Sequence, residues 1–263
     1  MSTMPTQGRF DSGRVVSRAF DLFRRRPFTY LVLTVCFVTL PALASGWVDA
    51  RFQAQTANGL LTGDVAGWFE GIAIAEGVAI LVGAIAYGLQ GAAALVAAHD
   101  LSGVESPVET ALLAEAPRLP MLLLTGLAAN AAIGLGSFLV IPGILLSLVW
   151  AVAAPVVAVE RLGLVAALNR TAALTRGHRG MIFVVMLLYG LASFVLSWGV
   201  RAIAGYPQFD VSQLTAPAVI LVINPLVRTV SAIGLAALVA SIYFELRQLK
   251  EGTTAEGLAA VFD

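Results

Sequence analysis

The sequence predicts an all-α membrane protein with six transmembrane helices. Of its 263 residues, 59% are hydrophobic and 12% are charged, whereas about a quarter of the residues in a soluble domain are charged. The apolar residues form long runs, and one crossing of the roughly 30 Å hydrocarbon layer takes about 20 residues of helix. The basic residues collect between alternate runs. This composition excludes an ordinary soluble domain.

The spans are expected to be helices because backbone polar groups in lipid must be paired within the segment itself. They cover about 28–48, 72–98, 119–137, 139–159, 181–203 and 218–246. The third and fourth come from one uncharged run that is twice the length of a crossing, so we expect the chain to reverse near Gly134, Gly136 and Ser137. A polar, glycine-rich loop is expected at 49–70, and a short one at 204–215.

The distribution of basic residues predicts the orientation. With six spans, thirteen of the sixteen basic residues flank one side, Arg51 and Arg201 flank the other, and Arg228 falls within the last span. Basic residues in short loops mark the cytoplasmic side. Three parts follow: a cytoplasmic tail at 1–27, a six-helix transmembrane domain at 28–248 and a cytoplasmic tail at 249–263, with both termini cytoplasmic.

The sequence of the first tail predicts a basic amphipathic helix. Asp11 or Ser12 is expected to cap its start, and Pro27 to end it. On a helical wheel one side is apolar and the other polar. Such a helix lies in the head-group plane of a membrane, where arginines meet anionic phosphates. Its apolar side can also pack on the bundle, and the two interpretations are compatible. The apolar side holds Val15, Val16, Ala19, Phe20, Leu22 and Phe23, and the polar side Arg14, Ser17, Arg18, Asp21, Arg24 and Arg25.

Two further segments, 106–118 and 159–180, lie on the same predicted side. Each enters a span through a junction like that at Pro27, which suggests a threefold quasi-repeat of an interfacial helix followed by a transmembrane hairpin. We expect lipid head-group contacts from arginines of the first tail and the 159–180 segment. These arginines are Arg14, Arg18, Arg24, Arg25, Arg26, Arg170, Arg176 and Arg179.

One alternative concerns the first apolar run. The arginines at 24–26, the run itself and Ala42-Leu43-Ala44 resemble a signal peptide with a small-residue cleavage site. The tail before the run is too long and too regularly patterned for an ordinary signal, so we expect the segment to be retained as a span.

The middle and end of the chain carry a set of residues that resembles a known family. The set comprises Pro142, Gly143, Trp150, Pro155, Glu160, Asn169, Arg170, Thr171 and Gly177, and the stretch from 242 to 252. It is similar to the bacterial membrane proteins grouped as glycerophosphoryl diester phosphodiesterase membrane-domain-like, or YciC-like. The residues after Arg170 and before Gly177 depart from the family pattern, which typically has serine and often lysine there.

The resemblance implies a bacterial inner-membrane protein that serves as an accessory or envelope-homeostasis component. The family's phosphodiesterase chemistry belongs to a separate soluble barrel, for which this chain has no room. We expect no enzymatic activity, because no metal-ligand spacing, phosphate loop or nucleophile motif occurs. No cofactor and no nucleic acid is expected. Membrane lipids, anionic ones in particular, are the expected partners, and a protein partner or a second copy stays open.

A small transporter, exporter or tolerance factor for an amphiphile is the alternative, because polar groups inside a membrane are costly and often functional. Glu76 and Arg228 should lie at similar depth, and we expect them to pair. Gln90 and Asn130 lie deeper. Prolines at 41, 142, 155 and 225 should bend or break their helices and free carbonyl groups. Trp150 is expected near the bilayer centre, where its indole N–H needs a partner.

Overall fold

The computed structural model describes residues 10–101, 113, 116–137, 139–205 and 223–252. These residues are helical apart from short connections, and no strand occurs among them. Within the same ranges six helical segments are long and apolar enough to cross a membrane, which confirms the predicted all-α class and a multi-pass membrane protein. They cover Pro27–Gly46, Val65–Ala98, Ala116–Ser137, Ile141–Glu160, Arg179–Ile203 and Asn224–Glu251.

The first described helix, α1 (Ser12–Arg25), lies where the sequence predicted an amphipathic helix. Asp11 caps it, since the Arg14 backbone N–H donates to Asp11 Oδ1 at 3.1 Å, and this bond lowers the pKa of Asp11. Pro27 ends α1 and opens α2 (Pro27–Thr34) at a position where no N–H is needed. A π-helical turn, η1 (Val35–Thr39), then leads into α3 (Leu40–Thr62). The turn precedes Pro41, which cannot donate to the helical ladder.

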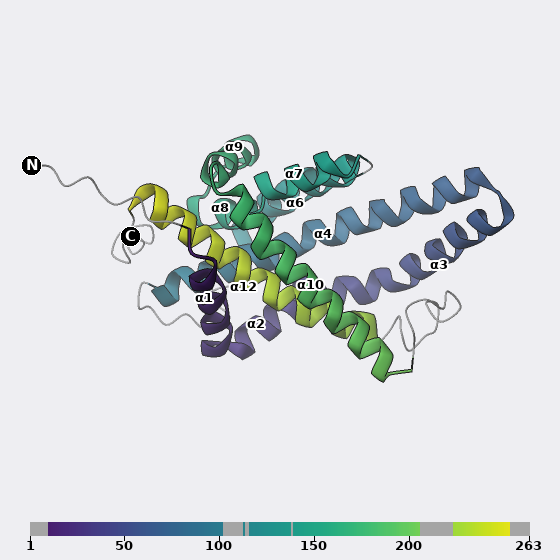
Figure 1. Cartoon of the computed structure of the whole chain (residues 1–263), viewed down its shortest axis with the longest axis horizontal. Coiled ribbons are helices and arrows are strands. Elements are labelled where there is room, and N and C mark those ends of the chain that lie inside the picture. Colours follow the sequence, from purple (N-terminus) through teal and green to yellow (C-terminus); the bar gives the residue numbers. More distant parts are fainter. Residues whose placement is uncertain (1–9, 102–112, 114–115, 138, 206–222, 253–263) are drawn as a thin grey trace, which may run out of the picture.

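The expected polar loop at 49–70 is a helical hairpin instead. Helix α3 continues to Thr62, and α4 (Val65–Leu101) starts three residues later. Gly63 ends α3 with a φ of 75°, and the Gly67 N–H donates to Asp64 Oδ1 at 3.0 Å. The 37 residues of α4 measure about 55 Å at 1.5 Å each, well beyond the hydrocarbon layer. Figure 1 shows this hairpin extending past the other helices on the right.

The long uncharged run reverses where the sequence predicted. A 3₁₀ turn, η2 (Ala116–Arg118), opens α6 (Leu119–Ser137), and α7 (Ile141–Val149) returns beside it. At this reversal Gly143 lies so close to Ser137 that an added Cβ would stand 2.8 Å from the Ser137 Cα atom. Glycine is therefore required for the tight return.

The fourth span breaks before Pro155, as expected. Helix α7 ends at Val149, and α8 (Ala153–Glu160) begins after a turn at Trp150. The Val149 carbonyl accepts a hydrogen bond from Thr175 Oγ1 at 3.3 Å. A side chain of the next segment thus pairs a carbonyl group at the break.

Helices α9 (Leu164–Thr175), α10 (Arg179–Ile203) and α12 (Asn224–Glu251) complete the described fold. The core lies where α8, the C-terminal third of α4 and the C-terminal half of α12 meet, because nearly all side chains there are buried. Helix α10 is the least buried of the six described spans and lies along the outside of α12 (Figure 1).

Some sequence predictions fall outside the described residues. They are most of the 106–118 segment, the short loop from residue 206 onward, the first residues of the sixth span and the last tail beyond Gly252. Two of the three expected interfacial helices, α1 and α9, are described.

Candidate functional site

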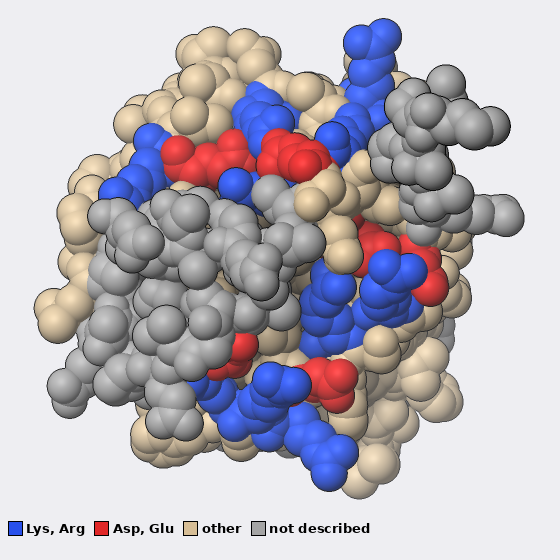
Figure 2. All heavy atoms as spheres, turned by 90° about the vertical axis from the view of Figure 1, so that its left-hand side faces the viewer, with Lys and Arg blue, Asp and Glu red and all other residues tan. Residues whose placement is uncertain are grey.

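The charged residues gather at one end of the bundle. This charged end is formed by α1, the C-terminal ends of α4, α8 and α12, helix α9 and the start of α10. Figure 2, turned to face this end, shows basic and acidic side chains interleaved across it. Ion pairs between segments far apart in the sequence hold the end together.

Helix α1 is held on α12 by a buried carboxylate. The Glu245 side chain is 1% exposed and lies 3.5 Å from Arg14 Nη1 and 3.6 Å from Arg18 Nη1. Val15 and Leu22 of α1 are buried in the same contact. Both carboxylate oxygens have ion-pair but not hydrogen-bond geometry. Because an isolated buried charge is costly, the two arginines fix the position of α1 across the end of α12.

A second ion pair fixes the junction between α1 and α2. Arg26 Nε lies 2.8 Å from Asp100 Oδ1 near the end of α4, and both side chains are mostly buried. Tyr30, one turn further along α2, is fully buried below this pair. The entry of the first span is therefore tied to the exit of the second.

The third cluster joins α8, α9 and α12 through Arg170. Its Nε donates to Glu160 Oε2 at 2.7 Å, and its Nη2 contacts Glu251 Oε1. The hydrogen bond to Glu160 raises the pKa of Arg170. Tyr243 donates to Glu160 Oε1 at 3.2 Å, and Arg247 donates to Glu251 Oε2 at 2.9 Å. Arg247 Nη1 also donates to the Tyr243 hydroxyl at 3.2 Å, so these five residues form a closed network.

Basic side chains also cover the carbonyl ends of helices at the charged end. Arg118 Nη1 donates to the Ala158 carbonyl of α8 at 2.7 Å. Arg179 Nη2 donates to the Ala172 carbonyl of α9 at 3.4 Å, and Lys250 Nζ donates to the neighbouring Ala173 carbonyl. Cations are favourable there because the C-terminus of a helix carries partial negative charge.

The apolar side of α1 is divided between the bundle and the outside. Val15 and Leu22 face the core, whereas Val16, Phe20 and Phe23 remain exposed, Phe20 by 65%. Arg24 and Arg25 are also exposed, at the end of the same helix. The part of the apolar side that holds Val15 and Leu22 thus packs on the bundle, as predicted. The exposed stripe is available for the predicted membrane contact.

The arginines predicted to contact lipid therefore differ in their surroundings. Arg14, Arg18, Arg26 and Arg170 have carboxylate partners within the protein, which the sequence analysis did not anticipate. Arg179 is partly buried, and its Nη2 contacts a helix end. Arg24, Arg25 and Arg176 are exposed. Lipid contact stays a prediction for all eight, and the exposed three are the arginines best placed for it.

The residues of the family-like set have structural roles wherever their contacts are described. Glu160 and Arg170 form the third cluster, and Thr171 Oγ1 donates to the Ala167 carbonyl within α9 at 2.8 Å. Gly177 links α9 to α10 with a φ of 89°, a conformation that favours glycine. Pro142, Gly143, Trp150 and Pro155 lie at the reversal and the break of the fourth span, and Asn169 is exposed on α9. The set therefore includes the residues that shape this half of the bundle.

The predicted ion pair between Glu76 and Arg228 stays a prediction. Glu76 lies against Gly134 of α6, and Arg228 lies in the second turn of α12. Near Arg228 the structure shows a different polar contact, since Arg201 Nη2 donates to Asn224 Oδ1 at 2.7 Å. Asn130 packs on Gly83 of α4 and donates within α6 to the Gly126 carbonyl at 2.7 Å. Of these contacts, the Arg201–Asn224 hydrogen bond joins α10 to α12, and Asn130 lies where α4 and α6 pack.

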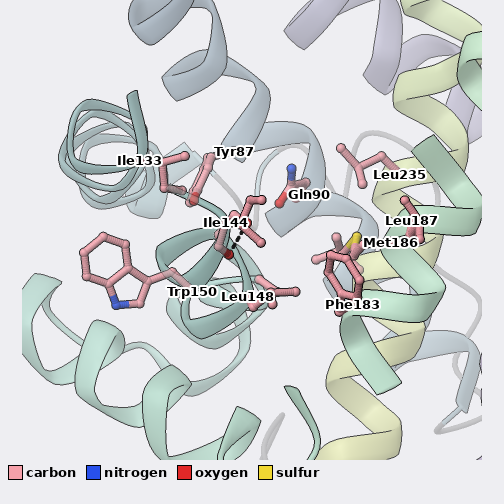
Figure 3. A pocket seen from close by; sticks show the side chains of 13 residues that line it. Tyr87, Gln90, Ile133, Ile144, Leu148, Trp150, Phe183, Met186, Leu187 and Leu235 are labelled. Carbon is pink, nitrogen blue, oxygen red and sulfur yellow. Dashed lines mark hydrogen bonds between the residues drawn. The ribbon is translucent and has the colours of Figure 1, made fainter. Parts of the chain in front are cut away.

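A pocket of about 410 Å³ lies within the membrane-spanning part, beside the break in the fourth span. We call it the membrane pocket. Tyr87 and Gln90 of α4 and residues of α6, α7, α10 and α12 line it (Figure 3). Its lining is apolar except for Gln90, Ser147, the Tyr87 hydroxyl and the Trp150 indole. Trp150 and Gln90 were predicted to lie toward the middle of the membrane, but a cavity lined by both was not predicted.

A smaller hollow of about 330 Å³ lies at the charged end, lined by Val159, Glu160, Arg161 and Arg247. Two of these residues already belong to the Arg170 cluster. Among the residues the structure describes, no three His, Cys, Asp or Glu side chains come together as metal ligands would.

No family model, no curated protein and no solved structure matches this chain.

Proposed function

We propose that this protein is a non-enzymatic accessory of a bacterial inner membrane, with a cytoplasmic charged end that binds anionic lipid head groups. This role agrees with the family resemblance of the sequence. The observation that carries it is α1: ion pairs to Glu245 hold the helix across the bundle, and Val16, Phe20 and Phe23 are left exposed.

The physical basis is the combination of an apolar stripe and exposed cations on one fixed helix. An amphipathic helix binds a membrane surface through buried apolar area together with attraction to anionic lipids, and each basic residue near an anionic surface contributes about 1 kcal/mol. Since α1 is already docked, it loses little conformational freedom on meeting lipid. Envelope homeostasis through lipid or partner contact is the corresponding cellular role.

The test measures which lipids the protein retains. The purified protein is exchanged into nanodiscs that hold phosphatidylglycerol and phosphatidylcholine in equal amounts, and the lipids that stay bound after detergent extraction are quantified. We expect enrichment of phosphatidylglycerol, and R24Q/R25Q should lower it. The matched control R161Q removes an exposed charge from the same end, at a residue outside the predicted lipid contacts, so it should lower the enrichment less than R24Q or R25Q alone. Equal retention of the two lipids contradicts the proposal.

A small transporter or exporter of an amphiphile is the second candidate. The observation that favours it is the broken fourth span beside the membrane pocket, because interrupted helices line substrate sites in many transporters. Proteoliposomes with a fluorescent lipid in both leaflets and an impermeant quencher outside test it. Loss of more than the outer-leaflet signal supports transport, and loss of the outer-leaflet signal alone supports the accessory role.

A further inference from the structure

The membrane pocket opens toward lipid. Ile144 of α7 and Phe183 and Leu187 of α10 line it and remain 40–48% exposed. They belong to membrane-spanning segments, so the medium outside them is hydrocarbon. At about 410 Å³ the pocket has the size of a small-molecule site. A chain that enters from the bilayer replaces lipid contacts with protein contacts and crosses no polar layer.

The walls provide a channel for one apolar chain. Figure 3 shows the labelled side chains of α7 and α10 lining the space, with Gln90 between them. Ser147 donates to the Ile144 carbonyl of its own helix at 2.7 Å, so its hydroxyl is already paired. The wall is otherwise formed mostly by aliphatic and aromatic carbon. A branched or charged solute finds few partners in such a site, whereas a hydrocarbon chain is complementary to it.

Arg179, the first residue of α10, lies on the same face of the helix as the residues that line the pocket. Phe183, Met186 and Leu187 lie four, seven and eight residues after Arg179, so all four share one face of the helix. Along the axis of α10, at about 1.5 Å per residue, Arg179 lies about 6 Å from Phe183 and about 12 Å from Leu187, toward the charged end. This separation suits a phosphate at Arg179 with an acyl chain running down the pocket.

Positive charge is in excess at this position. Arg179 and Lys250 contact neighbouring carbonyls at the end of α9. Arg176, the residue that follows α9, is exposed and close enough to Lys250 to act on it electrostatically. Among ion pairs between described residues, none involves these three cations. Arg179 Nε is buried and has no hydrogen-bond partner among described groups. An anionic head group supplies the missing charge and acceptors.

We propose that the membrane pocket holds one acyl chain of an anionic phospholipid whose phosphate binds Arg179. This proposal rests on the proposed function and names the position at which the lipid is held. The second acyl chain stays in the bilayer, because the pocket is open between α7 and α10. A free fatty acid, which has no second chain and a smaller head, is the competing occupant in the test.

The experiment uses photoreactive lipids in nanodiscs with the full chain. Phosphatidylglycerol, phosphatidylcholine and palmitic acid, each with a diazirine in the acyl chain, are cross-linked in parallel, and labelled residues are located by mass spectrometry. We expect phosphatidylglycerol to label peptides of α7 and α10 that line the pocket, and to exceed the other two probes. R179Q should lower phosphatidylglycerol labelling to the level of phosphatidylcholine.

Two filling variants block the pocket from opposite walls. L187W from α10 and I144W from α7 should each lower the labelling about tenfold, as a loss of about 1.4 kcal/mol in binding would. The matched controls L188W and L145W add the same ring to exposed neighbours that do not line the pocket, and they should keep the labelling. Either filling variant is enough to test the proposal, so the test still holds if one of the two misfolds.

The outcomes separate this proposal from the proposed function. If the filling variants keep full labelling, or palmitic acid labels more strongly than phosphatidylglycerol, the pocket proposal fails, although α1 can still select anionic lipid. If the pocket labels as expected but R24Q/R25Q leaves lipid retention unchanged, the proposed role of α1 fails and the pocket proposal stands.

Discussion

Glu245 is the single residue on which the position of α1 most depends. Its carboxylate is buried between Arg14 and Arg18. E245Q removes the charge and keeps the shape, which leaves two arginines facing an uncharged group. Breaking a buried ion pair costs about 3–5 kcal/mol, but Arg14 is half exposed, so we expect a loss of about 1–3 kcal/mol. Unfolding in mixed SDS micelles, followed by circular dichroism, measures it.

A double-mutant cycle with Arg18 provides the control. If the ion pair is the cause, E245Q/R18Q should be clearly more stable than the sum of the two single losses implies, because the charges are removed together. Strictly additive losses would mean that Glu245 stabilises the bundle by another route.

Gly177 is required by the backbone rather than by packing. Its φ is 89°, and an added Cβ would meet no atom within 4 Å. G177A should therefore destabilise the protein through strain alone, by about 1–2 kcal/mol. Gly180, three residues later, also has free space but no positive φ, so G180A should be neutral or stabilising by up to about 1 kcal/mol. Melting temperatures in detergent compare the two, and equal shifts would contradict the strain argument.

At the level of elements, the contact between α4 and α6 depends on close backbone approach. A Cβ at Gly126 would stand 2.8 Å from the Ala84 Cα atom. Since backbone cannot move aside as a flexible side chain can, G126A should separate the two helices and cost about 1–3 kcal/mol. Gly190 of α10 has no atom within reach of its Cβ, so G190A should stabilise by about 0.5–1 kcal/mol. Unfolding in mixed SDS micelles distinguishes them, and a stable G126A would show that this contact adapts.

The elements that the sequence predicted well are those that a lipid environment determines. Every described span overlaps its predicted range, since length and apolar content decide where a helix can cross. The hairpin of α3 and α4 was missed because polar, glycine-containing residues were taken as a loop. The signal was present in Thr62-Gly63-Asp64, where a glycine that ends one helix precedes an aspartate that caps the next. The glycines of the hairpin allow α3 and α4 to pack closely, as at Gly71 of α4 against Thr56 of α3.

At the scale of the whole molecule, the number of spans predicted that charged residues gather at one end. It did not predict which of them form ion pairs with one another. Hydropathy predicts that α1 and the end of α12 lie on the same side. It does not predict that Arg14 and Arg18 turn toward Glu245, because that pairing depends on the angle at which α1 crosses α12. The membrane pocket was also beyond the sequence, since the space left by a broken helix depends on how its neighbours pack.

The orientation of the whole bundle gives the last prediction. The charged end carries most of the described arginines, and moving arginine-rich segments across a membrane is costly, so this end should face the cytoplasm. In a C36S background, L61C marks the hairpin end, where Leu61 is 81% exposed, and N169C marks the exposed side of α9. An impermeant maleimide on intact cells should label L61C and leave N169C unlabelled. Inside-out vesicles serve as the control, because there the accessible cysteine should be N169C. If N169C reacts on intact cells, the charged end faces outward and its arginines meet the outer leaflet instead.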